Sequence, residues 1–117
     1  MKWHKNKNNV DILGENTRHR VIAELKMSDS KADWVDGFGK LIYSRDMMEE
    51  EKDRRNAILM YIVADQEPSS VLIRLATKHR ITLAVFDPHR NGFLLYNAVN
   101  VAAVKRVFKT AILLEKA

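Results

Sequence analysis

The chain has 117 residues, 46% of them hydrophobic and 30% charged, which suits one globular domain spanning residues 1–117. It has no cysteine, which excludes disulfides, zinc–thiolate sites and cysteine nucleophiles. Its formal net charge of +5 is compatible with a polyanionic partner. No apolar run reaches the roughly 18 residues of a membrane span, and no apolar signal core follows the basic start, so we expect a cytoplasmic protein without membrane association.

The first element expected along the chain is a β-hairpin. Residues 1–9 are polar and are expected to be loose. Residues 10–27 contain two apolar, strand-like runs, and the stretch 14–19 between them has the composition of a turn. The two runs are therefore predicted to pair as neighbouring strands.

One face of this hairpin collects charged side chains. Alternate residues of a strand share a face, so Glu24 and Lys26 point to the same side, and the turn brings Asp11 next to them. Two carboxylates and an amine would then meet at one point, the minimum set for holding a divalent cation and activating a water. The plain alternative is a surface ion pair between Glu24 and Lys26, worth under about 1 kcal/mol.

Helices and apolar strands alternate in the rest of the chain. Asp29 or Ser30 caps a helix that is predicted from residue 31 to about residue 51. Residues 57–64 are apolar on both faces, as in a central strand covered from both sides. The elements expected after them are a helix ending near residue 79, strands over 81–86 and 93–96, and a last helix capped by Asn100. This order predicts an α/β fold with a mixed central sheet flanked by helices.

Two glycines lie inside the long predicted helix. Gly37 and Gly39 each cost about 1 kcal/mol relative to alanine in a helix interior. Either the helix is simply weak here, or it bends, or another backbone approaches it closely.

The last predicted helix carries apolar side chains around much of its circumference. Val107 and Leu114 are seven residues apart and align along one side, away from the face that covers the sheet. An exposed apolar patch is typical of an interface, and twofold pairing is its commonest form, so we expect a homodimer. The alternative is that both faces of this helix are buried within one chain.

The arrangement of Asp11, Glu24 and Lys26, followed by a helix and a buried strand, resembles the PD-(D/E)XK nuclease superfamily. The resemblance covers about residues 9–65 and implies a restriction-endonuclease-like core. Val10 stands where the superfamily has its nominal proline. The family's activity, metal-dependent hydrolysis of DNA phosphodiester bonds, becomes the expected function.

The resemblance also assigns roles to residues. Asp11 and Glu24, with the backbone carbonyl of Leu25, would bind Mg²⁺ or Mn²⁺, and Lys26 would orient or deprotonate the attacking water. Several branches carry a Gln and a Tyr on the following helix, and this chain lacks the Gln. The residues expected to contact DNA are Arg18, Arg20, Lys40 and Tyr43, with Lys2, Lys5 and Lys7 around the mouth of the site.

The chain departs from the family by having no helix with a further Glu before Asp11. Either two carboxylates suffice, or Glu15 or a partner chain supplies a third, or the site does not cleave. If the chain is a nuclease, it resembles two branches equally: archaeal Holliday-junction resolvases, which cut branched DNA, and XisH-like mobile-element proteins. The alternatives are a non-catalytic nucleic-acid-binding or regulatory module on the same fold, and an unrelated α/β domain in which Glu24 and Lys26 are incidental.

Overall fold

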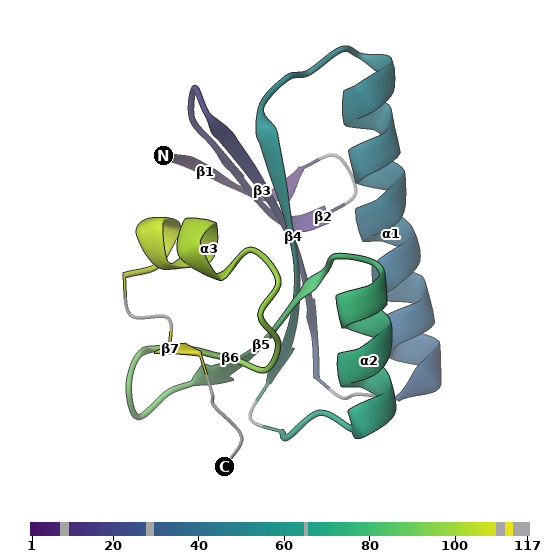
Figure 1. Ribbon diagram of the computed structural model, residues 1–117, viewed down its shortest axis with the longest axis vertical. Helices are drawn as coiled ribbons and strands as arrows, with labels where there is room; N and C mark the ends of the chain where they lie inside the picture. Colours follow the sequence, from purple (N-terminus) through teal and green to yellow (C-terminus); the bar gives the residue numbers. More distant parts are fainter. Residues whose placement is uncertain (8–9, 28–29, 65, 110–111, 114–117) are drawn as a thin grey trace.

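The computed structural model describes residues 1–117 except 8–9, 28–29, 65, 110–111 and 114–117 (Figure 1). Its elements are β1 (Lys2–Lys7), β2 (Val10–Glu15), β3 (His19–Lys26), α1 (Lys31–Glu50), β4 (Asn56–Ala64), α2 (Ser70–Lys78), β5 (Thr82–Asp87), β6 (Gly92–Leu95), α3 (Val101–Val107) and β7 (Ile112–Leu113).

The strands form one mixed sheet in which they lie side by side in chain order from β1 to β7. The strand β2 is antiparallel to both of its neighbours, β1 and β3, whereas β3, β4 and β5 run parallel. The helices α1 and α2 make the crossovers between these parallel strands and cover one face of the sheet, while α3 lies against the other face (Figure 1). The predicted α/β fold with a mixed central sheet flanked by helices is confirmed.

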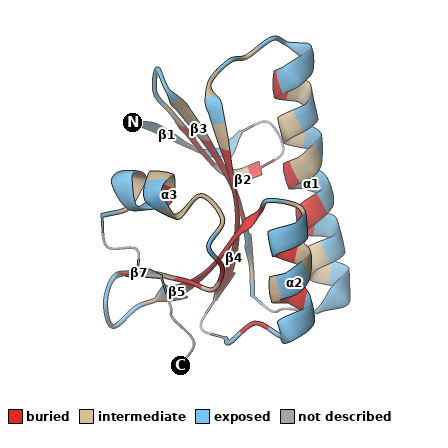
Figure 2. Ribbon diagram, in the orientation of Figure 1, coloured by how far each residue is buried: buried red, intermediate tan, exposed pale blue. Residues whose placement is uncertain are grey.

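Each face of the sheet has its own apolar cluster. Side chains of α1 and α2, including Phe38 and Leu72, pack on one face around Tyr61 of β4. On the other face, Val104 of α3 packs against Met60. Figure 2 shows that the central strands are the most buried part of the molecule. The run that forms β4 is therefore buried from both sides, as its composition predicted.

The start of α1 agrees with its expected cap. The hydroxyl of Ser30 accepts a hydrogen bond from the backbone N–H of Asp33, at 3.3 Å. Asp29, the other candidate, lies outside the described residues. None of the helices in the described part of the chain is long and apolar enough to cross a membrane.

The two glycines of α1 have different surroundings. A Cβ atom at Gly37 would lie 2.5 Å from Cε2 of Tyr61, so glycine is needed for the helix to approach the sheet this closely. The close approach at this position is made by the side-chain ring of Tyr61, whereas the sequence analysis expected another backbone. A Cβ atom at Gly39 would meet no atom within 4 Å.

The prediction that residues 1–9 are loose is wrong for most of that segment. Lys2–Lys7 form β1, which pairs with β2 from Lys2 opposite Glu15 to Lys7 opposite Val10. As an edge strand, β1 exposes most of its side chains, so it lacks the alternating apolar pattern by which strands are recognised.

The prediction of a long last helix is also wrong. The helix α3 ends at Val107, and Ile112 belongs to β7, which pairs with β6. The helix that was expected to carry Val107 and Leu114 along one side ends at Val107, and Leu114 lies outside the described residues. The homodimer stays a prediction, which sedimentation at micromolar concentration would test.

Candidate functional site

The site lies where the antiparallel pairing of β2 and β3 ends. The paired positions run from Glu15–Arg20 to Ile12–Ala23, and Asp11 and Glu24 come next. The backbone N–H of Asp11 donates a hydrogen bond to Oε1 of Glu24, at 3.3 Å. The N–H of Leu25 donates one to Oδ2 of Asp11, at 2.8 Å. These two bonds hold the carboxyl groups beside each other, as the sequence predicted.

Glu24 is buried at this junction, with only 1% of its surface exposed. It lies opposite Tyr61 of the parallel strand β4, which is itself covered by Phe38 of α1. Burial first, and then the negative charge of Asp11, raise the pKa of Glu24 to about 7, while the charge of Lys40 works in the opposite direction. Glu24 is therefore a carboxyl group that is short of positive charge.

Lys26 follows on the same face of β3, but it does not pair with the carboxyl groups. Its ammonium lies 2.8 Å from Oδ2 of Asp36 on α1, and the ammonium of Lys40 lies 3.4 Å from the same oxygen. The hydrogen bond to Asp36 raises the pKa of Lys26, so this side chain is a cation and not a ready proton acceptor. Among the described residues, no Lys or Arg forms an ion pair with Asp11 or Glu24.

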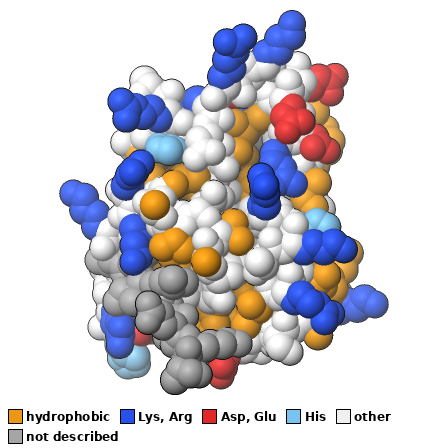
Figure 3. Space-filling view, in the orientation of Figure 1, with side chains coloured by type: hydrophobic (Ala, Val, Ile, Leu, Met, Phe, Trp, Pro, Cys, Tyr) orange, Lys and Arg blue, Asp and Glu red, His pale blue; other side chains and the backbone are white. Residues whose placement is uncertain are grey.

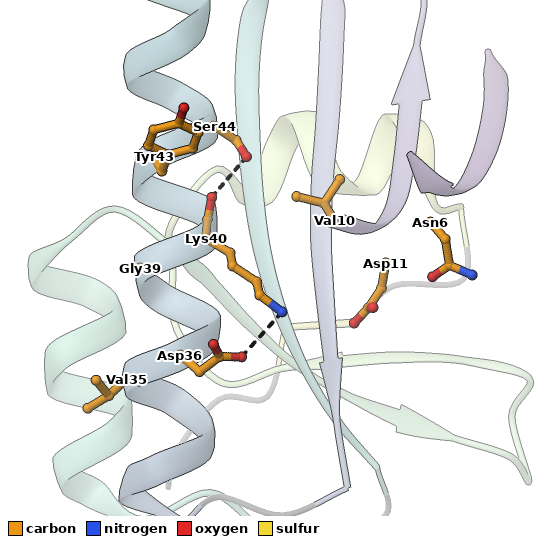
Figure 4. Close-up of a pocket in the computed structure, with 9 residues that line it drawn as sticks. All are labelled: Asn6, Val10, Asp11, Val35, Asp36, Gly39, Lys40, Tyr43 and Ser44. Atoms are coloured by element: carbon orange, nitrogen blue, oxygen red, sulfur yellow. Dashed lines mark hydrogen bonds and ion pairs between the residues drawn. The ribbon is translucent and has the colours of Figure 1, made fainter. Parts of the chain in front are cut away.

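A groove of about 680 Å³ opens beside the carboxyl pair, between α1 and the start of β2. Figure 4 shows Lys40 extending from the helix across this groove toward Asp11, with its ammonium paired with Asp36 of the same helix. The groove is lined by Asn6, Val10, Asp11, Val35, Asp36, Gly39, Lys40, Tyr43 and Ser44.

A second hollow continues this groove along α1. It shares Val10, Tyr43 and Ser44 with the first and reaches Arg20 on β3. Together the two hollows form a trough, and we use that name below for the surface that runs from Asp11 past Tyr43 to Arg20.

The other residues expected at the site lie partly on α1 and partly along the hairpin. Lys40 and Tyr43 line the groove, and the Tyr43 side chain is 64% exposed. Arg20 lies at the far end of the trough, where its guanidinium is 3.5 Å from Asp53 and 3.7 Å from Glu15. Arg18 is exposed in the hairpin turn, beyond the end of the trough.

The structure also limits where a further acidic ligand could come from. Glu15 lies at the closed end of the hairpin and pairs with Arg55 at 3.2 Å, so it is not the missing third carboxylate. In the described part of the chain, no three His, Asp or Glu side chains cluster closely enough to hold a metal ion. Asp36 is the one groove residue of clear electrostatic importance that the sequence analysis missed. Its only sequence signal is its spacing of four from Lys40.

Comparisons of this chain with protein-family models, with curated proteins and with solved structures found no match in any of the three. The side chains around Asp11 and Glu24 are therefore the basis for inferring a function.

Proposed function

We propose that this chain is a metal-dependent nuclease that hydrolyses DNA phosphodiester bonds, on a restriction-endonuclease-like core made of β2, β3, α1 and β4. The observation that supports it most is the Asp11–Glu24 pair, held together by two backbone hydrogen bonds and short of positive charge. Its surroundings agree, because a hairpin, a helix and a parallel strand follow one another in the order found in the PD-(D/E)XK superfamily.

The donor set suits a hard divalent cation. Asp11 and Glu24 would hold Mg²⁺ or Mn²⁺, with the carbonyl of Leu25 as a further ligand, and such a cation would offset the charge that burial leaves uncompensated. When bound, the metal would activate a water and stabilise the charge that develops at phosphorus. Lys26 and Lys40 would neutralise phosphate oxygens, since both ammonium groups lie at the edge of the site.

DNA is the proposed polyanionic partner. The net charge is +5, and Lys and Arg side chains are spread over most of the face shown in Figure 3. The acidic side chains on that face gather mainly beside the end of α1. A duplex and a branched substrate both agree with this distribution of charge.

One contact favours a second candidate, a non-catalytic nucleic-acid-binding or regulatory module on the same fold. The ammonium of Lys26 is engaged by Asp36 at 2.8 Å, whereas cleavage requires it to serve the water or the phosphate. A module of this kind would bind DNA without cutting it, with or without a metal ion.

Cleavage assays separate the two candidates. A supercoiled plasmid and a labelled four-way junction are incubated with the protein in Mg²⁺, Mn²⁺ or EDTA. We expect cleavage with either metal and none in EDTA. Asp11→Asn should abolish it while keeping an acceptor for the N–H of Leu25. Glu15→Gln is the matched control, because it removes a carboxylate from the other end of the hairpin. Unchanged cleavage by Asp11→Asn would remove Asp11 from the site.

Lys26 provides an independent test of the proposed nuclease activity. Lys26→Ala should lower the cleavage rate strongly and DNA affinity only weakly, because it removes a cation of the site that is already paired with Asp36 in the free protein. Equal losses of rate and affinity would instead assign Lys26 to binding alone.

A further inference from the structure

Gly39 is a glycine that the fold itself does not require. Its neighbour in the same helix, Gly37, is needed because a Cβ atom there would overlap the ring of Tyr61. A Cβ atom at Gly39 would meet nothing within 4 Å, and no glycine among the described residues has a positive φ. Neither packing nor backbone conformation therefore explains a poor helix former in the middle of α1.

The place of Gly39 in the trough offers an explanation. Asp36, Gly39, Lys40 and Tyr43 recur at helical spacing, so they form one wall, and Asp11 lies on the opposite wall (Figure 4). Gly39 lies three residues after Asp36 and four before Tyr43, so with no side chain there this wall is open between Asp36 and the exposed ring of Tyr43, beside Lys40.

We propose that the trough is the track of one nucleic-acid strand, and that Gly39 lets its sugar–phosphate backbone approach α1 next to Asp11. This inference rests on the proposed function. A phosphodiester strand fits the groups that line this wall. Lys40 offers a cation for a phosphate, Gly39 offers room for the backbone, and Tyr43 offers a ring face on which a base can stack.

Substitutions at Gly39 test the track because they should separate stability from binding. Gly39→Ala should raise the melting temperature by about 4 °C, since alanine is the better helix former and meets no neighbour. The same change should weaken DNA binding at least about 5-fold, and Gly39→Leu should weaken it further, because the added side chain fills the track.

Two controls match these variants. Gly37→Ala should lower the melting temperature, because its Cβ atom has to displace Tyr61. Ala32→Leu adds a comparable side chain at an exposed position of α1 outside the trough, so it should leave binding unchanged.

Binding is measured by fluorescence anisotropy with fluorescein-labelled single-stranded and duplex oligonucleotides, in Ca²⁺ so that binding is followed without turnover. The variants are compared on whichever probe the wild type binds more tightly. If Gly39→Leu binds DNA as tightly as the wild type, the track is wrong but the proposed nuclease is unaffected. The same conclusion follows if Gly39→Ala loses both stability and binding. A wild type that binds neither probe overturns both proposals.

Discussion

Carboxylates lie at both ends of the β2–β3 hairpin, where Asp53, from the segment between α1 and β4, joins Glu15 at the closed end; the pKa is lowered for these two and raised for Glu24 at the open end. At the closed end, the hydrogen bond and charge of Arg55 lower the pKa of Asp53 to about 2, and Arg55 also pairs with Glu15. At the open end, burial and the neighbouring Asp11 raise the pKa of Glu24 to about 7. The two ends are about 13 Å apart, the length of four strand residues.

The ionised carboxylates of the closed end stabilise the fold, whereas ionisation of Glu24 destabilises it. The acids of the closed end lie among arginines, so ionisation strengthens their interactions. Glu24 lies under α1 next to another acid, and its ionisation is opposed by the protein. Residues perturbed by burial together with a like charge are typical of functional sites, which is why the open end is the candidate site.

The largest expected difference between the two ends is in cleavage. Glu24→Gln should reduce metal-dependent cleavage at least about 100-fold, because it removes a ligand charge where the phosphate reacts. Asp53→Asn should leave the rate within about 3-fold, because Asp53 is paired with Arg55 at the far end. Initial rates on a labelled DNA at saturating Mg²⁺ provide the measurement, and similar losses in the two variants would contradict the division.

The second difference is in how stability depends on pH. Because the pKa of Glu24 rises from 4.5 in the unfolded chain to about 7 in the fold, the folded state binds more protons between these values. The free energy of unfolding should therefore fall as pH rises from about 4.5 to 7, by up to about 3 kcal/mol at 1.36 kcal/mol per unit.

Urea unfolding of the wild type and of Glu24→Gln at pH 5 and pH 8, in EDTA, measures this dependence. The variant should be the more stable of the two at pH 8, since its amide cannot ionise. Taking the difference between the two proteins removes the contributions of the titratable groups that they share. Parallel pH profiles would show that Glu24 ionises without penalty.

At the closed end the sign is reversed. Because Arg55 lowers the pKa of Asp53 from 3.8 to about 2, its carboxylate stabilises the fold above pH 3.8, and this contribution is lost as pH falls through 2. Asp53→Asn should therefore cost about 1–2 kcal/mol at pH 7, and the difference from wild type should shrink toward pH 2. Thermal unfolding followed by circular dichroism at pH 7, 4 and 2.5 would show whether it does.

Much of the fold could be predicted because its strongest patterns come from burial. The run that forms β4 is apolar at every inner position, and such a run is typical of a central strand covered on both sides. The strand β1 could not be predicted in this way. Lys2–Lys7 are mostly exposed, and their place at the sheet edge depends on pairing with β2, which leaves no periodic signal in the sequence.

In the candidate site, the contacts within the hairpin could be predicted from strand geometry, but the contacts with α1 could not. Alternation along β3 and the hairpin turn were enough to place Asp11 beside Glu24. The ion pair of Lys26 with Asp36 could not be predicted, because Asp36 comes from α1, which approaches the sheet closely where Gly37 meets Tyr61. Contacts between a strand and a packed helix require the tertiary fold.

The smallest expected effects concern two cations, Lys40 of α1 near the open end of the hairpin and Arg18 in the turn at its closed end. Lys40 reaches across the groove beside the carboxyl pair, whereas Arg18 is exposed in the turn at the closed end. If DNA lies along the open end, Lys40→Ala should weaken binding a few-fold and lower the slope of log affinity against log salt by about 0.9, the loss of one phosphate contact. Arg18→Ala removes the same charge from the chain, so an effect of net charge alone would appear equally in both variants. Titrations of a labelled duplex between 50 and 300 mM KCl would separate the two. Equal slopes for the two variants would mean that DNA is attracted to the whole surface and does not dock at the groove.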